Sequence, residues 1–344
     1  MVLKELCALR GVSGDEGRVR EFIRQRVEPF ATSVKTDRMG NLIAFRRGTG
    51  ENRRHILLAA HMDEVGLVVK GICDDKTGAE KGLIRYATVG EIDPRVVVSK
   101  PVRIGDGETP GVIGAKAIHL QSAEERAKML PHNQLSIDVG AKNLDSAEKL
   151  ASLGDTITFE SRWVEFGDGL VKARALDDRI GCMVMMSVLE GEYPCDVTCV
   201  FTVQEEIGSR GAAAAAYGVE SDAALILDAA IANDLGRAPG DAQVCALKKG
   251  VALSFMDRRS IANVPLYARL RSLAEENDIP WQVRQLTTGE NDAGAFQRAA
   301  GPRAVCTLSV PCRYMHTPSN VAAFADIEAM YRLVDAFLTA GGAF

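Results

Sequence analysis

The stretch ILLAAHMD (residues 56–63) places five consecutive apolar residues directly before a histidine, with an aspartate two positions further on. A short apolar run of this kind predicts a strand that is buried on both faces and ends at His61. In open α/β sheets, reactive groups gather beyond the carboxyl ends of parallel strands. We therefore expect His61 and Asp63 at a position suited to chemistry, in preference to a simple surface turn.

The same pattern of an apolar strand that runs into acids recurs in VTCVFTVQEE (residues 197–206) and AALILD (residues 223–228). Burying so many carboxylates at one edge of a sheet is costly unless cations neutralise them. Five short segments carry side chains able to bind metal at or just after predicted strand ends: His61-x-Asp63, Asp177-Asp178, Glu205-Glu206, Asp228 and His316.

Two histidines with several carboxylates form a mixed nitrogen and oxygen ligand set. This set suits Zn²⁺, Co²⁺ or Mn²⁺ better than Ca²⁺, which favours oxygen alone, or iron–sulfur clusters, which need thiolates. The surplus of carboxylates favours two divalent ions that share a bridging carboxylate and a water of lowered pKa. The predicted chemistry is hydrolysis, with Asp177 as the better bridge candidate.

The remaining acids allow two interpretations each. Asp63 can orient the imidazole of His61 through its other nitrogen. Adjacent residues point different ways, so one of Glu205 and Glu206 can bind metal while the other acts as a general base. Asp178 is as consistent with a helix cap as with a role in the site.

The length of the chain and the change in residue pattern along it predict two domains of an α/β protein. The chain has 344 residues, of which 47% are apolar and 25% charged, as in ordinary soluble globular proteins. Short runs separated by Gly, Pro and Asp fill residues 68–164 and predict an inserted β-rich domain. Alternating helix and strand patterns occupy residues 1–67 and 165–344, which we expect to form one discontinuous domain.

Local patterns predict individual elements. Ser13 and Glu16 have the spacing of a capping box, so a helix is expected to open near Gly14. Gly40-Asn41 predicts a hairpin turn. The other expected elements are short β-type runs at residues 96–98, 111–114 and 156–159, helices over Ile180–Leu189 and Ser209–Tyr217, and strands over Val197–Val203 and Ala223–Leu227.

Charge and hydropathy exclude several partners. The net charge is −5 and no long basic block is present, which is unlike a nucleic-acid-binding surface. No apolar run reaches the roughly 18 residues of a membrane-spanning helix. The eight cysteines form no C-x-x-C pair and are typical of reduced core thiols. We therefore expect a cytoplasmic protein that binds neither nucleic acid nor membrane.

Longer segments resemble a known family across almost the whole chain. The similar segments are AAHMDEVGLVV, PVRIGDGETPGVIGAKAIHLQ, LSIDVGAKN, ALDDRIGC, VQEEIGSRGA and CRYMHTPSN, which begin at residues 59, 101, 135, 175, 203 and 312. Together they resemble the tetrahedral and glutamyl aminopeptidases, metallopeptidase family 42. One departure is GENDAG (residues 289–294), where many relatives carry GGTDAG, so Asp292 is kept while its neighbours differ.

The resemblance implies an aminopeptidase with two metal ions, which removes N-terminal residues from small peptides. It implies an α/β/α mixed-sheet domain with an inserted PDZ-like β barrel for dimerisation, and dimers that assemble into a dodecamer. Zn²⁺ is the expected metal, with Co²⁺ or Mn²⁺ as alternatives. By motif, the implied ligands are His61, Asp177 and Asp228 for one ion and Asp177, Glu206 and His316 for the other, with Glu205 as general base and Asp63 as the partner of His61.

Other functions remain as alternatives at this stage. Paired carboxylates also occur in glycoside hydrolases, although these enzymes seldom need a catalytic metal, and only Trp163 and Trp281 are available to stack on sugars. A metal-dependent deacetylase or carboxypeptidase on a related scaffold is the nearest enzyme alternative. A non-catalytic shell protein would be expected to lack Glu205, which is present.

Overall fold

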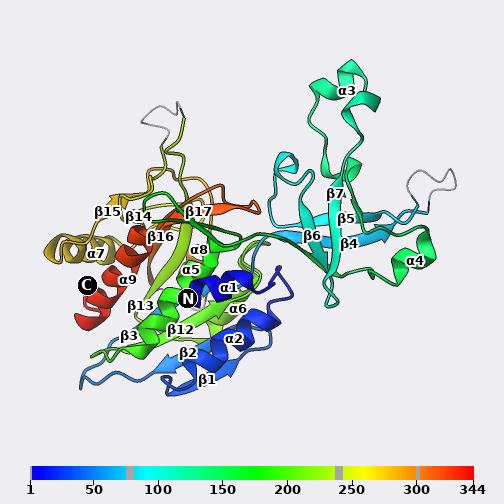
Figure 1. Ribbon diagram of the computed structural model, residues 1–344. Coiled ribbons are helices and arrows are strands. Elements are labelled where there is room, and N and C mark those ends of the chain that lie inside the picture. Colours follow the sequence, from blue (N-terminus) through cyan, green and yellow to red (C-terminus); the bar gives the residue numbers. More distant parts are fainter. Residues whose placement is uncertain (1, 75–80, 237–242, 300–302) are drawn as a thin grey trace.

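A computed structural model describes residues 2–74, 81–236, 243–299 and 303–344 of the chain. It combines a mixed α/β part, built on an 11-stranded sheet, with a closed six-stranded antiparallel barrel (Figure 1). No described helix is both long enough and apolar enough to span a membrane.

The large sheet is mixed, and its strand order is β1-β2-β12-β3-β13-β16-β17-β11-β10, with β14 paired to β15 and β16. Its strands are β1 (Ser33–Thr36), β2 (Leu42–Arg46), β3 (His55–His61), β10 (Val164–Phe166), β11 (Leu170–Ala173), β12 (Asp196–Thr202), β13 (Ala223–Ile231), β14 (Val251–Ser254), β15 (Trp281–Val283), β16 (Ala304–Arg313) and β17 (Asn320–Ala323).

Four parallel strands form the centre of this sheet, in the order β12-β3-β13-β16. Strand β3 contains the quoted apolar stretch, and all six residues from Ile56 to His61 are buried. Successive side chains of a strand point to opposite faces. Leu58 accordingly packs into the core on one face and Leu57 into the core on the other. The central strand therefore needs helices on both sides.

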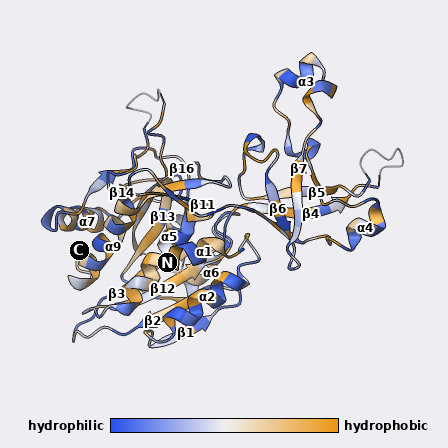
Figure 2. Ribbon diagram, in the orientation of Figure 1, coloured by the Kyte–Doolittle hydropathy of each residue, from blue (hydrophilic) through white to orange (hydrophobic). Residues whose placement is uncertain are grey.

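Helices cover both faces, as an α/β/α arrangement requires, and apolar colour is concentrated on the central strands (Figure 2). One face packs against α1 (Val2–Ala8), α2 (Gly17–Val27), α5 (Leu176–Glu190), α7 (Val264–Glu276) and α9 (Phe324–Thr339). The other face packs against α6 (Arg210–Gly218) and α8 (Ala293–Arg298).

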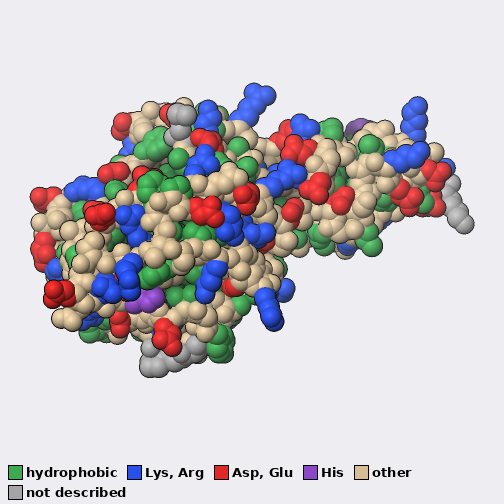
Figure 3. All heavy atoms as spheres, turned by 90° about the horizontal axis from the view of Figure 1, so that it is seen from below, with side chains coloured by type: hydrophobic (Ala, Val, Ile, Leu, Met, Phe, Trp, Pro, Cys, Tyr) green, Lys and Arg blue, Asp and Glu red, His purple; other side chains and the backbone are tan. Residues whose placement is uncertain are grey.

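The barrel closes in the order β4-β5-β8-β7-β6-β9 around an apolar core of its own. Its strands are β4 (Gly66–Ile72), β5 (Ile84–Val89), β6 (Pro101–Ile104), β7 (Thr109–Gly114), β8 (Ser136–Asp138) and β9 (Thr156–Phe159), and two short helices, α3 (Ala123–Ala127) and α4 (Leu144–Glu148), lie in its connections. Helix α3 projects away from the sheet (Figure 1). Acidic and basic side chains are interspersed over the face drawn in Figure 3.

Polar contacts join the barrel to the start of α2 and to the residues just before it. Arg18 pairs with Asp106 and Glu108 of the β6–β7 hairpin, at nitrogen–oxygen distances of 3.2 and 3.1 Å. Thr156 of β9 donates a hydrogen bond to Asp15 over 2.7 Å. Because the barrel leaves the sheet directly after β3, these contacts determine how its loops face the end of that strand.

Two local predictions are wrong because distant partners take over the polar groups. Helix α2 begins at Gly17, and no capping box forms: the hydroxyl of Ser13 donates to Asp63, while Glu16 accepts from the backbone of Gly14 and Gln204. The predicted β-type run at residues 96–98 overlaps a 3₁₀ turn at Pro94–Val96, in which Asp93 caps the N-terminus and proline occupies the first turn.

The other element predictions are confirmed within a residue or two at most boundaries. The strands and helices predicted around residues 111–114, 156–159, 197–203, 209–217 and 223–227 are present, and β13 extends four residues further than expected. Helix α5 begins at Leu176, four residues before the predicted helix. Helix α1 was not predicted. The Gly40-Asn41 turn joins β1 and β2, and Gly40 has a φ of +103°, which glycine adopts freely.

A buried asparagine ties this turn to the loop after β12. The Oδ1 atom of Asn41 accepts from the backbone N–H of Val203 over 3.0 Å, and its Nδ2 donates to the carbonyl of Gly211 over 2.9 Å. A Cβ atom at Gly211 would lie 2.3 Å from the carbonyl oxygen of Val203, so the close approach requires glycine. Asn41 thus anchors both ends of the segment that carries Glu205 and Glu206.

We predict that Asn41→Ala lowers the free energy of unfolding by about 1–3 kcal/mol, because the buried N–H of Val203 loses its partner. Urea denaturation measures the change. Asn52→Ala removes an exposed asparagine and should leave stability within about 0.5 kcal/mol of the unaltered protein. Equal unfolding midpoints for the two variants would contradict the role given to Asn41.

Candidate metal centre and active site

Parallel strand order brings the acidic segments together at one edge of the sheet. His61 is the last residue of β3 and lies in register with Thr202, the last residue of β12. Asp228 lies within β13, opposite Ser309 of β16. Glu205 and Glu206 follow β12, and His316 follows β16 by three residues. Asp177 reaches the same edge from the start of α5.

These side chains form two groups that share one aspartate. The first group contains His61, Asp177 and Asp228, and the second contains Asp177, Glu206 and His316; within each, one ligand atom per residue lies within 4.8 Å of the others. The Nε2 atom of His61 is 3.3 Å from Oδ1 of Asp177. The Nε2 atom of His316 is 3.6 Å from Oδ2 of Asp177 and 3.3 Å from Oε2 of Glu206. The two oxygens of Asp177 therefore face different groups.

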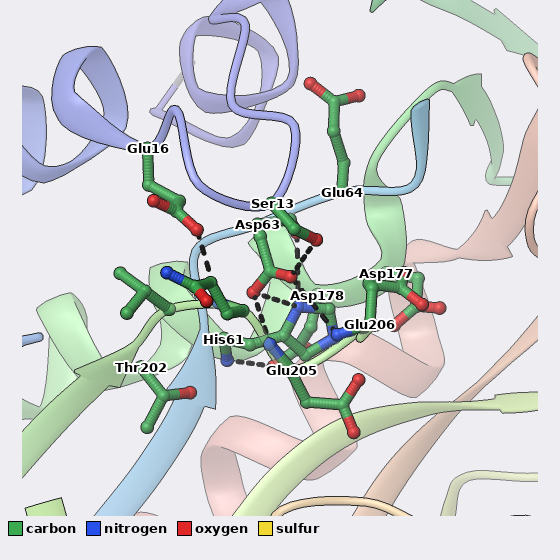
Figure 4. A network of polar contacts seen from close by, with 12 residues as sticks. Ser13, Glu16, His61, Asp63, Glu64, Asp177, Asp178, Thr202, Glu205 and Glu206 are labelled. Carbon is green, nitrogen blue, oxygen red and sulfur yellow. Dashed lines mark hydrogen bonds and ion pairs between the residues drawn. The ribbon is translucent and has the colours of Figure 1, made fainter. Parts of the chain in front are cut away.

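Asp63 is fully buried and connects His61 to the 205–206 segment (Figure 4). Its carboxylate accepts from Ser13 Oγ over 2.6 Å and from the backbone N–H groups of Glu205 and Glu206 over 3.0 and 3.2 Å. It lies 3.5 Å from Nδ1 of His61. Asp63 therefore positions the imidazole and the acidic segment together, while its own oxygens are occupied.

The two aspartates of the 177–178 pair have separate environments. Asp178 accepts from the backbone N–H of His61 over 3.2 Å and from that of Gly181 over 3.0 Å. Asp178 therefore caps the start of the regular part of α5 and also holds the end of β3. The helix cap was one of the two roles that the sequence allowed for it. Asp177 lies outside helical geometry, with φ −83° and ψ 108°, and its side chain faces the two groups described above.

Left-handed backbone flanks several residues of the site. Ala175, Gln204 and His316 have φ values of +55°, +56° and +56°. A non-glycine residue in this region costs roughly 1–2 kcal/mol, and such positions cluster at functional sites. The first of these residues lies two positions before Asp177, the second lies directly before Glu205, and the third is the ligand candidate itself.

Burial and nearby negative charges raise the pKa values of three carboxylates in the site. Burial, reinforced by Asp177, raises the pKa of Asp228 to about 7. Burial also raises the pKa of Glu206 well above its usual value, with Asp177 the next largest cause. For Glu205, burial and then the nearby charges of Asp292 and Glu206 raise the pKa well above the usual value. The positively charged groups of the protein therefore compensate only part of the negative charge of these acids.

Asp63 and Asp177 behave in the opposite way. Burial alone would raise the pKa of each, but hydrogen bonds and charge from His61 lower both below the usual value. Burial alone would lower the pKa of His61, yet its hydrogen bonds to Asp177 and Asp63 raise that pKa well above normal. In the chain alone, a proton on His61 compensates part of the negative charge.

The residues present fit divalent cations by their chemistry. Each group offers one imidazole and two carboxylates, a donor set suited to Zn²⁺ and its neighbours in the first transition series. The raised pKa values of Glu206 and Asp228 indicate an excess of negative charge that cations at these positions would relieve.

Next to the two groups lies a cleft of about 550 Å³. Both groups contribute to its lining, together with Glu205, Ser254, Arg258, Arg284, Glu290 and Asn291. The side chain of Glu205 is half-buried, belongs to neither group, and has no hydrogen-bond partner among the described residues. Glu205 is therefore available to a molecule in the cleft.

Sequence reasoning missed several residues that support this arrangement. Ser13 was interpreted as a helix cap, although it holds Asp63. Asn291 donates to Oδ2 of Asp228 over 2.9 Å, and Asp292 accepts from Thr202 Oγ1 over 2.6 Å. The departure of GENDAG from GGTDAG was the available signal for Asn291, since an amide beside a kept aspartate suggests a polar partner.

A second missed cluster lies beside Asp63. Glu64 is buried, pairs with Arg174 and lies 3.6 Å from the guanidinium of fully buried Arg179. Both arginines also donate to backbone carbonyls at or just after the end of α1. These two cations flank the 175–178 segment and fix it against the N-terminal helix.

Comparisons with known proteins agree with this geometry. The profile of a family described as M42 glutamyl aminopeptidase matches residues 40–333. The lysyl aminopeptidase of Pyrococcus furiosus is 30% identical over 98% of this chain and 96% of its own length. The glutamyl aminopeptidase of Lactococcus lactis is 28% identical over 98% of this chain and 95% of its own length.

Solved structures are similar over the same extent. The TET1 peptidase of Pyrococcus horikoshii, which can assemble into a tetrahedron or a large octahedral shell, superposes with a TM-score of 0.85 at 33% identity and covers 98% of each chain. The similarity includes both the sheet and the barrel. The chain belongs to the M42 glutamyl aminopeptidase family.

Proposed function

We propose that the protein is a metal-dependent aminopeptidase that hydrolyses the first peptide bond of small peptides. The observation that carries this proposal is the pair of ligand groups that share Asp177, beside an unpartnered Glu205 in the same cleft. Membership of an aminopeptidase family supports the substrate class.

Two divalent ions fit the two groups, with His61, Asp177 and Asp228 as the ligands of one and Asp177, Glu206 and His316 as the ligands of the other. We propose Zn²⁺ as the metal, with Co²⁺ or Mn²⁺ as alternatives. Such ions supply Lewis-acid polarisation of the scissile carbonyl and activation of a water molecule. Asp63 orients His61, and Asn291 orients Asp228.

Glu205 is the proposed general base. A carboxylate oxygen of Glu205 takes a proton from the attacking water and returns it to the nitrogen of the leaving amine. Burial raises the pKa of Glu205 above its usual value, which makes its carboxylate a stronger proton acceptor. The contact of its backbone N–H with Asp63 holds the side chain at the cleft.

The charge of the cleft favours a substrate with a free N-terminus. An α-ammonium group carries positive charge, and acids that line the cleft but belong to neither ligand group, such as Glu205 and Glu290, provide an anionic environment for it. A peptide with a blocked N-terminus lacks this charge. We therefore propose exopeptidase action, with hydrolysis beginning only at a free amine.

The domain division and assembly are also proposals. We propose that residues 1–67 and 165–344 form the catalytic domain, and that residues 68–164 form a PDZ-like domain through which dimers associate into a dodecamer. Exposed apolar side chains on a barrel connection, Ile118 and Leu120, support self-association. The assembly of the P. horikoshii TET1 peptidase supports it further.

We propose a cytoplasmic location because of the state of the cysteines. All eight are free and buried, which is typical of proteins from reducing compartments.

The glycosidase alternative gains no support from the described residues. Trp163 and Trp281 do not line the cleft: Trp163 packs near Phe324 with the two rings tilted, and Trp281 lies in β15. A sugar in the cleft would meet no indole surface. Family membership likewise favours an aminopeptidase over a deacetylase or a carboxypeptidase.

We predict that chelation abolishes release of the first residue from short peptides, and that adding Zn²⁺, Co²⁺ or Mn²⁺ restores it. The ligands stay in place but lose the ions that they share. Amino-acid analysis of the products measures the release, and N-acetylated peptides serve as the control that should remain intact. Full activity in protein shown by elemental analysis to contain no metal would contradict the proposal.

We predict that Glu205→Gln lowers kcat by about 10²- to 10⁴-fold, the usual contribution of a general base, without loss of bound metal. Glu206→Gln should instead lower metal content, because a neutral amide replaces an anionic ligand. Steady-state kinetics and elemental analysis on both variants separate the two roles. Normal turnover in Glu205→Gln, or loss of an ion from it, would overturn the assignment.

A further inference from the structure

The barrel contributes one acidic side chain to the cleft. Glu91, which lies two residues after β5, lines the cleft together with the metal-binding carboxylates. Among the described residues of the lining, it is the only one from the barrel segment 66–159. Its carboxylate has no hydrogen-bond or ion-pair partner in the described part of the chain. Glu91 is thus an exposed, unpaired charge at the site.

The neighbouring glycine explains how the barrel comes so close. Gly90 has a φ of +82°, and a Cβ atom there would lie 2.7 Å from Cγ1 of Val65 and 3.4 Å from Cβ of Glu206. The backbone just before Glu91 therefore packs directly against a metal-ligand candidate. This position is set by the fold and does not depend on the flexible end of a side chain.

A second hollow adjoins the cleft at this point. It has a volume of about 780 Å³ and is lined by residues 88 and 90–95 of the barrel, Met129, and residues 315–317. The cleft and the hollow share three lining residues, Glu91, Met315 and His316. The two spaces therefore meet at these side chains. A peptide that extends from the metal groups past His316 enters the hollow beside Glu91.

Glu91 sets the charge of the hollow. The other ionisable residues of its lining are Asp93, Arg95 and His316. Asp93 and Arg95 neutralise each other through hydrogen bonds that include contacts of 3.0 and 2.8 Å. His316 faces Asp177 and Glu206 on the side of the metal groups. One uncompensated negative charge remains, and it belongs to Glu91.

We propose that Glu91 is a specificity-determining residue that favours peptides with a basic second residue. This inference rests on the proposed function. An aminopeptidase holds a single residue on the amino side of the scissile bond, so the cleft takes the first side chain. The rest of the peptide needs the open space beyond His316, where the second side chain meets Glu91.

The size of the effect follows from the exposure of Glu91. Exposed ion pairs contribute about 0.2–1 kcal/mol, which corresponds to a preference in kcat/KM of up to about fivefold. A lysine at position 91 would repel the same substrates and attract acidic ones, so it should reverse the order. Salt screens charges that lie near the surface, so the preference should weaken as ionic strength rises.

Three tripeptides that differ only at the second position test the proposal: X-Lys-Gly, X-Gln-Gly and X-Glu-Gly. The first residue X is the one that the metal-loaded enzyme releases fastest from a panel of aminoacyl anilides. The readout is the ratio of kcat/KM for the Lys and Glu peptides, which is independent of the fraction of active enzyme. Glu148→Gln is the matched control, since it makes the same change on an exposed barrel residue outside both spaces.

The unaltered enzyme and Glu148→Gln should both prefer the Lys peptide by about 1.4- to fivefold. Glu91→Gln should bring the ratio close to one, and Glu91→Lys should invert it. An unchanged ratio in both Glu91 variants, with hydrolysis intact, would overturn the inference and leave the proposed function standing. A change confined to the preference for the first residue would also overturn it, since Glu91 would then belong to the pocket for that residue. Failure of the unaltered enzyme to release any first residue would instead contradict the proposed function, and with it this inference.

Discussion

The need to neutralise Asp177 from two sides is the constraint on which the site depends. Its carboxylate is buried at the edge of the sheet, with one oxygen near His61 and the other near His316. Glu206 and Asp228 add negative charge on either side, and their raised pKa values show that the folded chain alone compensates that charge poorly. Buried anions of this kind persist in proteins when cations share them. The folded chain therefore holds several acids close together in an arrangement that divalent cations would stabilise.

The surrounding structure holds these groups together by contacts that are distant in sequence. Asp63 joins His61 to the backbone of the 205–206 segment, and Asn41 anchors the base of that same segment. On the opposite side, Arg174 and Arg179 fix the strand-to-helix connection that carries Asp177. The barrel then adds a wall to the cleft through Gly90 and Glu91. The residues that line the cleft thus come from both parts of the fold.

Sequence patterns predicted those features of the structure that depend on short-range periodicity. The apolar runs before His61, Glu205 and Asp228 predict buried parallel strands, and parallel strands end at a common edge, so the meeting of these residues followed from local information. The patterns failed where polar side chains choose distant partners. Ser13 bonds to Asp63 and Glu16 to Gln204, so the helix start that their spacing indicates does not form there. Glu91 has no local signature, and Asn291 shows only the departure of GENDAG from GGTDAG, because their roles depend on how the barrel and a loop pack against the sheet.

The central claim, that one carboxylate is shared by two ions, is tested most directly by counting bound metal in two variants. Elemental analysis of Zn²⁺-loaded protein should give two ions per chain for the unaltered sequence. Asp177→Asn should reduce the occupancy of both sites, because both groups contain Asp177, whereas His316→Ala should leave the site of His61 and Asp228 filled. The account predicts close to zero ions in the first variant and one in the second. The same loss in both variants, or a single ion in the unaltered protein, would contradict it.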